Sequence, residues 1–177
     1  MTREIPDSHA LHRLFRGITE YTFMNELGIG DPNLVGYVAD LLVRFVPAQT
    51  IWRLRNARGE RLTEVTAMVA EAEASTDASR RYECHRHVGD FTLFWTGIYP
   101  DALDQLRAST SADHLVDFQA QGKRSYRLAS ELDGEEKKRP ILRRLSDEFE
   151  LYAFGLSCIR KEWERPDPQL APRGLVA

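Results

Sequence analysis

Apolar residues recur at spacings of three and four along most of the chain, which is the period of an α-helix with one buried face. Two helices are predicted near the N-terminus, the first capped by Ser8 and the second started by Asp31-Pro32. A central helix follows the capping stretch Ser75-Thr76-Asp77 and stops at Tyr99-Pro100. A further helix is expected over 61–74, long ones over 111–132 and 140–163, and shorter ones over 51–58 and 102–107.

The central helix is the most buried element that the sequence predicts. From Phe91 to Tyr99 it is apolar on nearly every side, which is typical of a helix surrounded by other helices. Gly89 and Gly97 would let neighbouring helices approach closely. We therefore expect the other helices to pack around this one.

The last predicted helix has the most regular apolar seam in the chain. Such a seam favours either antiparallel packing within a bundle or a contact between two copies of the chain. Pro166 ends the helix, and the tail 166–177 is expected to be mobile. The seam consists of Leu142, Leu145, Phe149, Tyr152, Leu156, Ile159 and Trp163.

No run of alternating apolar and polar residues and no hairpin turn predicts a strand. The fold class is therefore all-α: a single-domain helical bundle over residues 1–165, with five long helices plus one or two short ones. A length of 177 residues is enough to bury a core of this kind without disulfides.

Composition narrows the range of partners and the cellular location. The net charge of −3 gives no general attraction for nucleic acid or for an anionic membrane, and no nucleic-acid-binding motif is present. No apolar run reaches the ~20 residues of a membrane-spanning helix, and the N-terminus lacks the pattern of a signal peptide. Cys84 and Cys158 lie far apart in sequence, which suits spare thiols in a reducing cytoplasm. We expect a cytoplasmic protein that binds neither nucleic acid nor membrane.

One stripe of the central helix has the chemistry of metal ligands. Glu83, His87 and Asp90 lie at i, i+4 and i+7, and His114 with Asp117 could supply the opposite half of an iron or manganese site. However, the paired Glu-x-x-His motifs of di-iron bundles are missing. A simpler interpretation is that Glu83–His87 and Arg86–Asp90 are i, i+4 pairs along one helix.

Asp90 directly precedes the apolar half of this helix, where an unpaired carboxylate would be costly. We expect Arg86, Arg124 and Tyr126 to be its partners in a buried polar network that fixes how two helices dock. The alternative is a carboxylate with a raised pKa, poised for proton transfer beside a pocket. The structural interpretation is favoured, because ion-pair networks perturb carboxylates as readily as catalysis does.

Aromatic residues near the centre would also suit a small apolar ligand or a haem, with His85 or His87 as axial ligand. Core packing is the simpler explanation of such stripes.

The pattern Arg86-x-x-Gly89-Asp90-x-x-Leu93-Phe94-x-x-Gly97, followed by Gly122-x-x-x-Tyr126, resembles a bacterial all-helical family. The resemblance covers about the middle third of the chain. It implies a bacterial helical domain, attaches no catalytic activity to it, and links Asp90 with Tyr126 as a dependent pair.

The sequence thus favours a protein without a cofactor that acts through helix-mediated association, as a homodimer formed through the Leu142–Trp163 helix. The alternative is a helical-bundle metalloenzyme or a binder of a small apolar ligand or haem, with its site around Glu83, His87 and Asp90.

Overall fold

The computed structural model describes residues 8–45, 53–132 and 134–165, and this part of the chain is all-α, as predicted. It contains eight α-helices and no strand, apart from an isolated bridge between Arg55 and Arg61. No helix in the described ranges has both the length and the apolar character needed to cross a membrane. The helices are α1 (Ser8–Glu20), α2 (Pro32–Phe45), α4 (Val65–Ala74), α5 (Ala78–Ile98), α6 (Pro100–Arg107), α7 (Phe118–Glu131), α8 (Arg139–Asp147) and α9 (Phe149–Trp163).

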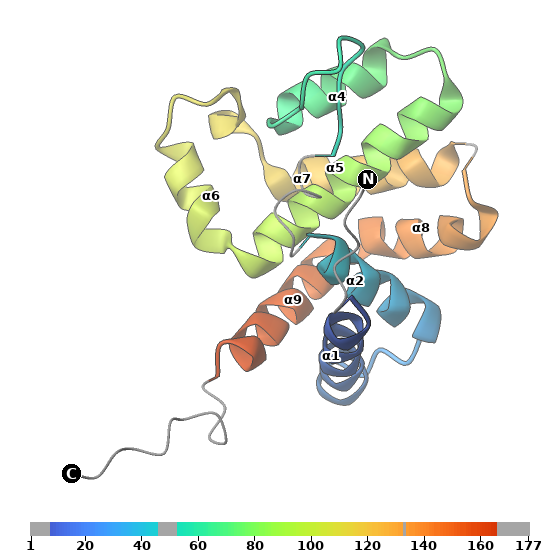
Figure 1. Cartoon of the computed structure of the whole chain (residues 1–177), viewed down its shortest axis with the longest axis vertical. Helices are drawn as coiled ribbons and strands as arrows, with labels where there is room; N and C mark the ends of the chain where they lie inside the picture. Colours follow the sequence, from blue (N-terminus) through green and yellow to red (C-terminus); the bar gives the residue numbers. More distant parts are fainter. Residues whose placement is uncertain (1–7, 46–52, 133, 166–177) are drawn as a thin grey trace.

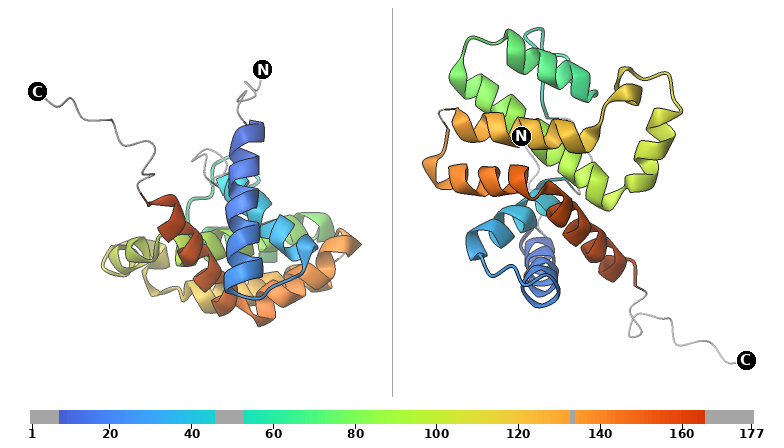
Figure 2. Two further views of the ribbon diagram at one scale, coloured as in Figure 1. Left: turned by 90° about the horizontal axis from the view of Figure 1, so that it is seen from below. Right: turned by 180° about the vertical axis from the view of Figure 1, so that it is seen from behind.

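Helix α5 is the centre of the arrangement, as its apolar pattern predicted. It packs most extensively on α7 and also contacts α4, α9 and α2. α5 and α7 cross each other closely, α7 lying behind α5 in Figure 1 and in front of it in the right-hand view of Figure 2. The Asp77 side chain caps α5 by accepting a hydrogen bond from the Ser79 N–H at 3.0 Å.

Two glycines of α5 are needed for close helix packing, as expected. A Cβ on Gly89 would lie 2.6 Å from the ring of Tyr126 in α7, and one on Gly97 would lie 2.9 Å from the Ala153 carbonyl oxygen in α9. Both separations are far below van der Waals contact, so a side chain at either position would push a neighbouring helix away.

The N-terminal pair of helices is also close to prediction. α1 continues into a short π-helix, Tyr21–Glu26, and Asp31 starts α2 by accepting from the N–H groups of Asn33 and Leu34. α1 packs against α2, and its Phe15 ring meets Trp163 of α9 edge to face at 5.1 Å. α1 is seen nearly end-on in Figure 1 and side-on at the left of Figure 2, so it stands across the α5–α7 layer.

The prediction of a single helix over 140–163 is wrong. The helix is interrupted at Glu148 (φ −118°, ψ 31°), which separates α8 from α9. No proline or glycine signals the break. It lets α8 pack on α7 while α9 packs on α5 and the N-terminal helices, so each half buries its own apolar side chains. All seam residues from Leu142 to Ile159 are buried in the core, and only Trp163 is exposed, by 41%.

The helix predicted over 111–132 is also interrupted. A short 3-10 helix, Ala112–Leu115, precedes α7, and Leu115 is 84% exposed although the periodicity placed it on the buried face. Two aspartates cause the interruption because their side chains bind backbone N–H groups. Asp117 caps α7 at Ala120, and Asp113 binds the start of α4.

The remaining short elements give a mixed result. The helix expected after Pro100 is present as α6. Residues 53–58 are not helical, which contradicts the short helix predicted over 51–58; Ile51 and Trp52 lie outside the described residues, as does the tail 166–177. The helix expected over 61–74 is present as α4 but begins only at Val65. The described chain thus has eight α-helices, where five long and one or two short ones were predicted.

Candidate functional site

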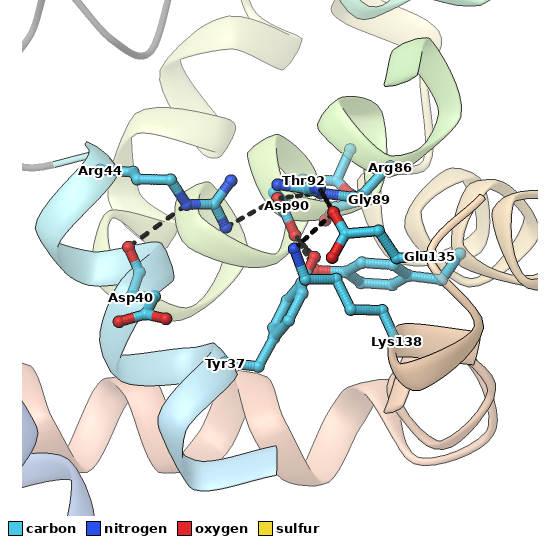
Figure 3. A network of polar contacts seen from close by, with 10 residues as sticks. Tyr37, Asp40, Arg44, Arg86, Gly89, Asp90, Thr92, Glu135 and Lys138 are labelled. Carbon is cyan, nitrogen blue, oxygen red and sulfur yellow. Dashed lines mark hydrogen bonds and ion pairs between the residues drawn. The ribbon is translucent and has the colours of Figure 1, made fainter. Parts of the chain in front are cut away.

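The most extensive buried polar network surrounds Asp90, whose side chain has no exposed surface. One carboxylate oxygen, Oδ1, accepts hydrogen bonds from the Tyr37 hydroxyl at 2.6 Å and from the Tyr126 hydroxyl at 2.9 Å. The other oxygen, Oδ2, accepts from Arg44 Nη2 at 3.1 Å. Arg86 Nε lies 3.8 Å from Oδ2, at ion-pair distance. The side chains labelled in Figure 3 show Tyr37, Arg44 and Arg86 converging on this carboxylate.

These groups come from three helices, and on α2 and α5 helical spacing places two of them on the same face. Tyr37 and Arg44 lie two turns apart on α2, and Arg86 and Asp90 one turn apart on α5. Tyr126 reaches the carboxylate from α7 across the space that Gly89 leaves open. The network therefore ties α2, α5 and α7 together at one buried charge.

The charge state of Asp90 follows from its partners. Burial raises its pKa, but the charges of Arg44 and Arg86 and the two tyrosine hydrogen bonds outweigh burial, so the pKa lies below its usual value. Burial and the Asp90 charge raise the pKa of Tyr37 and of Tyr126 well above the ordinary value, so both hydroxyls stay protonated. The hypothesis of a raised-pKa carboxylate poised for proton transfer is therefore wrong.

The prediction of the network was right for Arg86 and Tyr126 and wrong for Arg124. Arg124 is exposed on α7 and makes no hydrogen bond or ion pair to Asp90. The two α2 partners, Tyr37 and Arg44, were missed. Both lie beside the apolar face of α2. The sequence did contain a signal for them, because a tyrosine and an arginine seven residues apart lie on the same side of a helix, next to its buried stripe.

The structure does not bring the five predicted metal ligands together. Glu83 is exposed and pairs with Arg80 at 3.9 Å, and the buried His87 ring lies 5.6 Å from the ring of Phe45. His114 Nδ1 is 2.8 Å from the carbonyl oxygen of Ser111, and Asp117 caps α7. Across residues 8–45, 53–132 and 134–165 no three His, Cys, Asp or Glu side chains are grouped as a metal site.

A cleft of about 330 Å³ opens beside the Asp90 network, between α1, α2, α5 and the start of α8. Arg44 and Arg86 reach it with side chains that are 24% and 14% exposed. Two further carboxylates lie near its edge: Glu135 contacts Lys138 Nζ at 2.9 Å and Arg86 Nη1 at 3.8 Å, and Asp40 lies 2.9 Å from His12 Nε2. The lining residues are His12, Tyr37, Asp40, Val43, Arg44, Arg86 and Lys138.

A third guanidinium adds positive charge to this region. Burial lowers the pKa of Arg53, and the charges of Arg86 and Arg44 lower it further, which places Arg53 within their electrostatic reach. No hydrogen bond or ion pair joins the Arg53 side chain to another residue of the described chain. Three guanidinium groups therefore lie within electrostatic range of the buried Asp90 carboxylate.

Comparison with protein-family models, with curated proteins and with solved structures gave no match for this chain.

Proposed function

We propose that this protein binds a small anionic molecule, a carboxylate or a phosphate ester, in the cleft beside Arg44 and Arg86. The observation that carries the proposal is the excess of positive charge at this cleft. Arg44 and Arg86 pair with the fully buried Asp90, and Arg53 lies within electrostatic range of it. With Lys138 these are four cationic side chains, against the three carboxylates Asp90, Asp40 and Glu135, the last of which Arg86 and Lys138 share.

The arginine side chains have donors to spare. Arg44 uses one N–H on Asp90 and Nε on the Asp40 carbonyl oxygen at 3.3 Å, which leaves part of its guanidinium for a ligand. Arg86 forms 3.8 Å ion pairs with Asp90 and with Glu135. Guanidinium groups held in this way match the paired oxygens of carboxylates and phosphates.

The size of the cleft and the role of Asp90 support a binding site. A volume of about 330 Å³ lies at the lower end of the range for small-molecule pockets, roughly 300–1,000 Å³. Asp90 is ionised, buried and saturated with donors, so it orients Arg44 and Arg86 and does not contact the ligand.

Anion titrations with matched arginine variants test the proposal. Pyrophosphate and citrate are titrated by isothermal calorimetry at low ionic strength, where charge interactions are least screened. Arg53→Gln removes one unpaired charge and is expected to weaken binding about tenfold. Arg58→Gln, on an exposed arginine of the same segment, is the control and should leave affinity unchanged. The absence of saturable binding, or equal weakening by the two variants, contradicts the proposal.

Self-association through the last part of the chain is a second candidate. The seam that predicted it is buried within the subunit, but the outer face of α9 carries Leu151, 37% exposed, and Phe154, 55% exposed, one turn apart. A second copy of the chain covering this face would remove both side chains from water. Light scattering at several concentrations should then show a dimer that Phe154→Ser dissociates, and a monomer at every concentration contradicts this candidate.

A further inference from the structure

An apolar pocket of about 220 Å³ lies between α5, α6 and the start of α7, and it shares no lining residue with the cleft beside Arg44 and Arg86 that is proposed to bind anions, called the anion cleft below. Aromatic and leucine side chains form its walls. Polar groups are confined to one side, where the chain enters α4 and leaves α6. The residues that matter here are Phe91, Trp95, Phe118, Leu103, Leu106 and Glu64.

One side of the pocket is held by hydrogen bonds, and another is covered by the partly exposed helix α6. Its α4 side is fixed by Asp113, whose carboxylate accepts from the N–H of Val65 at 2.6 Å and from the N–H of Thr66 at 2.9 Å. Its cover is α6, which has no fully buried residue and whose Leu103 and Leu106 are only partly buried. α6 lies at the edge of the molecule in Figure 1 and packs mainly on α5 and on the 3-10 helix Ala112–Leu115.

The charged side chains that line the pocket are both acidic, Glu64 and Asp113. Glu64 accepts hydrogen bonds from the Ser111 hydroxyl at 2.9 Å and from the Ala112 N–H at 3.3 Å, and no cation within the described chain forms an ion pair with it. The second carboxylate, Asp113, is occupied at the positive N-terminal end of α4. No lysine, arginine or histidine lines the pocket.

We infer that this pocket binds a small aromatic ammonium ion. An aromatic-walled cavity with an uncompensated carboxylate suits a ring that carries a positive charge, because ring faces and a carboxylate both attract cations. A dry cavity of about 150 Å³ is enough for benzene, so this volume admits one ring with a short amine arm. An anion of the same shape would be repelled by Glu64.

Three ligands that share a phenyl ring and a short arm but end in a positive, a neutral or a negative group test the inference. 2-Phenylethylamine, 2-phenylethanol and phenylacetate are titrated at neutral pH by isothermal calorimetry and by amide chemical-shift perturbation. The amine should bind about tenfold more tightly than the alcohol, a ratio that cation–π attraction and the carboxylate together can supply. Phenylacetate should bind more weakly than the alcohol.

Variants locate the binding. Glu64→Gln retains an acceptor for Ser111 and should bring the amine to the affinity of the alcohol. Leu106→Trp and, as a second filling variant, Ala102→Trp should each abolish binding of amine and alcohol, with folding checked by circular dichroism. Arg53→Gln should change nothing here, which separates this site from the anion cleft. Equal affinity for amine and alcohol in the wild type, no binding of either, or an unchanged preference in Glu64→Gln overturns the inference.

Discussion

Replacing Asp90 by asparagine keeps the side-chain shape and removes the charge at the centre of the network. The asparagine oxygen can still accept from both tyrosine hydroxyls, but its amide group would face the Arg44 donor that now lies 3.1 Å from Oδ2. Breaking a buried ion pair costs about 3–5 kcal/mol. The arginine side chains are 24% and 14% exposed and so keep some hydration, which brings the expected loss to about 3 kcal/mol.

Alanine at the same position should cost more than asparagine. It also strands the two buried tyrosine hydroxyls, each at about 1–3 kcal/mol, so the total loss should be at least about 5 kcal/mol. That is a large share of the 5–15 kcal/mol by which typical domains are stable. Both losses are measured by urea denaturation followed by circular dichroism and fluorescence.

The control and the pH dependence make the Asp90 prediction specific. Asp104→Asn, on a side chain that is 75% exposed, should stay within about 0.5 kcal/mol of wild type. The pKa of Asp90 lies below its usual 3.8, so its charge stabilises the fold above that pH. This stabilisation is lost as pH falls through the folded-state pKa, and the difference between wild type and Asp90→Asn should then shrink. An Asp90→Asn protein within about 1 kcal/mol of wild type at neutral pH would refute the reasoning.

Three further predictions concern packing, capping and titration. Gly97→Ala should lower stability by about 1–3 kcal/mol in urea denaturation, because its Cβ meets the backbone of α9, whereas Gly17→Ala, with nothing within 4 Å, should raise it by about 0.5–1 kcal/mol. Asp113→Ala should lower the free energy of unfolding by about 2 kcal/mol and speed amide hydrogen exchange in the first turn of α4. General destabilisation would instead speed exchange throughout the protein. The pKa of Tyr37 and of Tyr126 is raised above the usual 10.0, so their protonated hydroxyls stabilise the fold fully below pH 10.0. This stabilisation is lost as pH rises through the folded-state pKa. An alkaline titration followed by tyrosine absorbance should therefore place Tyr37 and Tyr126 among the tyrosines that ionise late. Tyr37→Phe and Tyr126→Phe should each remove one late-ionising tyrosine. Ionisation of Tyr37 and Tyr126 at the ordinary pH would contradict the network.

Local patterns in the sequence determined the helical class and most helix starts. Asp31-Pro32, Asp77 and Pro100 act within one turn of their own position, so each predicts a boundary without knowledge of the fold. The apolar run after Asp90 likewise predicted a buried central helix, because only a helix enclosed by neighbours can be apolar on most sides. The buried, partnered state of Asp90 followed from the same pattern, since an unpaired charge there would be costly.

Tertiary structure alone decided where helices break and which side chains meet. Glu148 carries no breaking signal, and the chain bends there because α8 and α9 pack on different helices. Arg44 lies 46 residues from Asp90 in sequence and Asp113 lies 48 from Val65, so no local spacing indicates either contact. The docking of α2 on α5 also selected Arg44 over Arg124 as the partner of the buried carboxylate. Burial and charge pairing across helices are properties of the packed chain, and they created both the cleft beside Arg44 and Arg86 and the aromatic pocket.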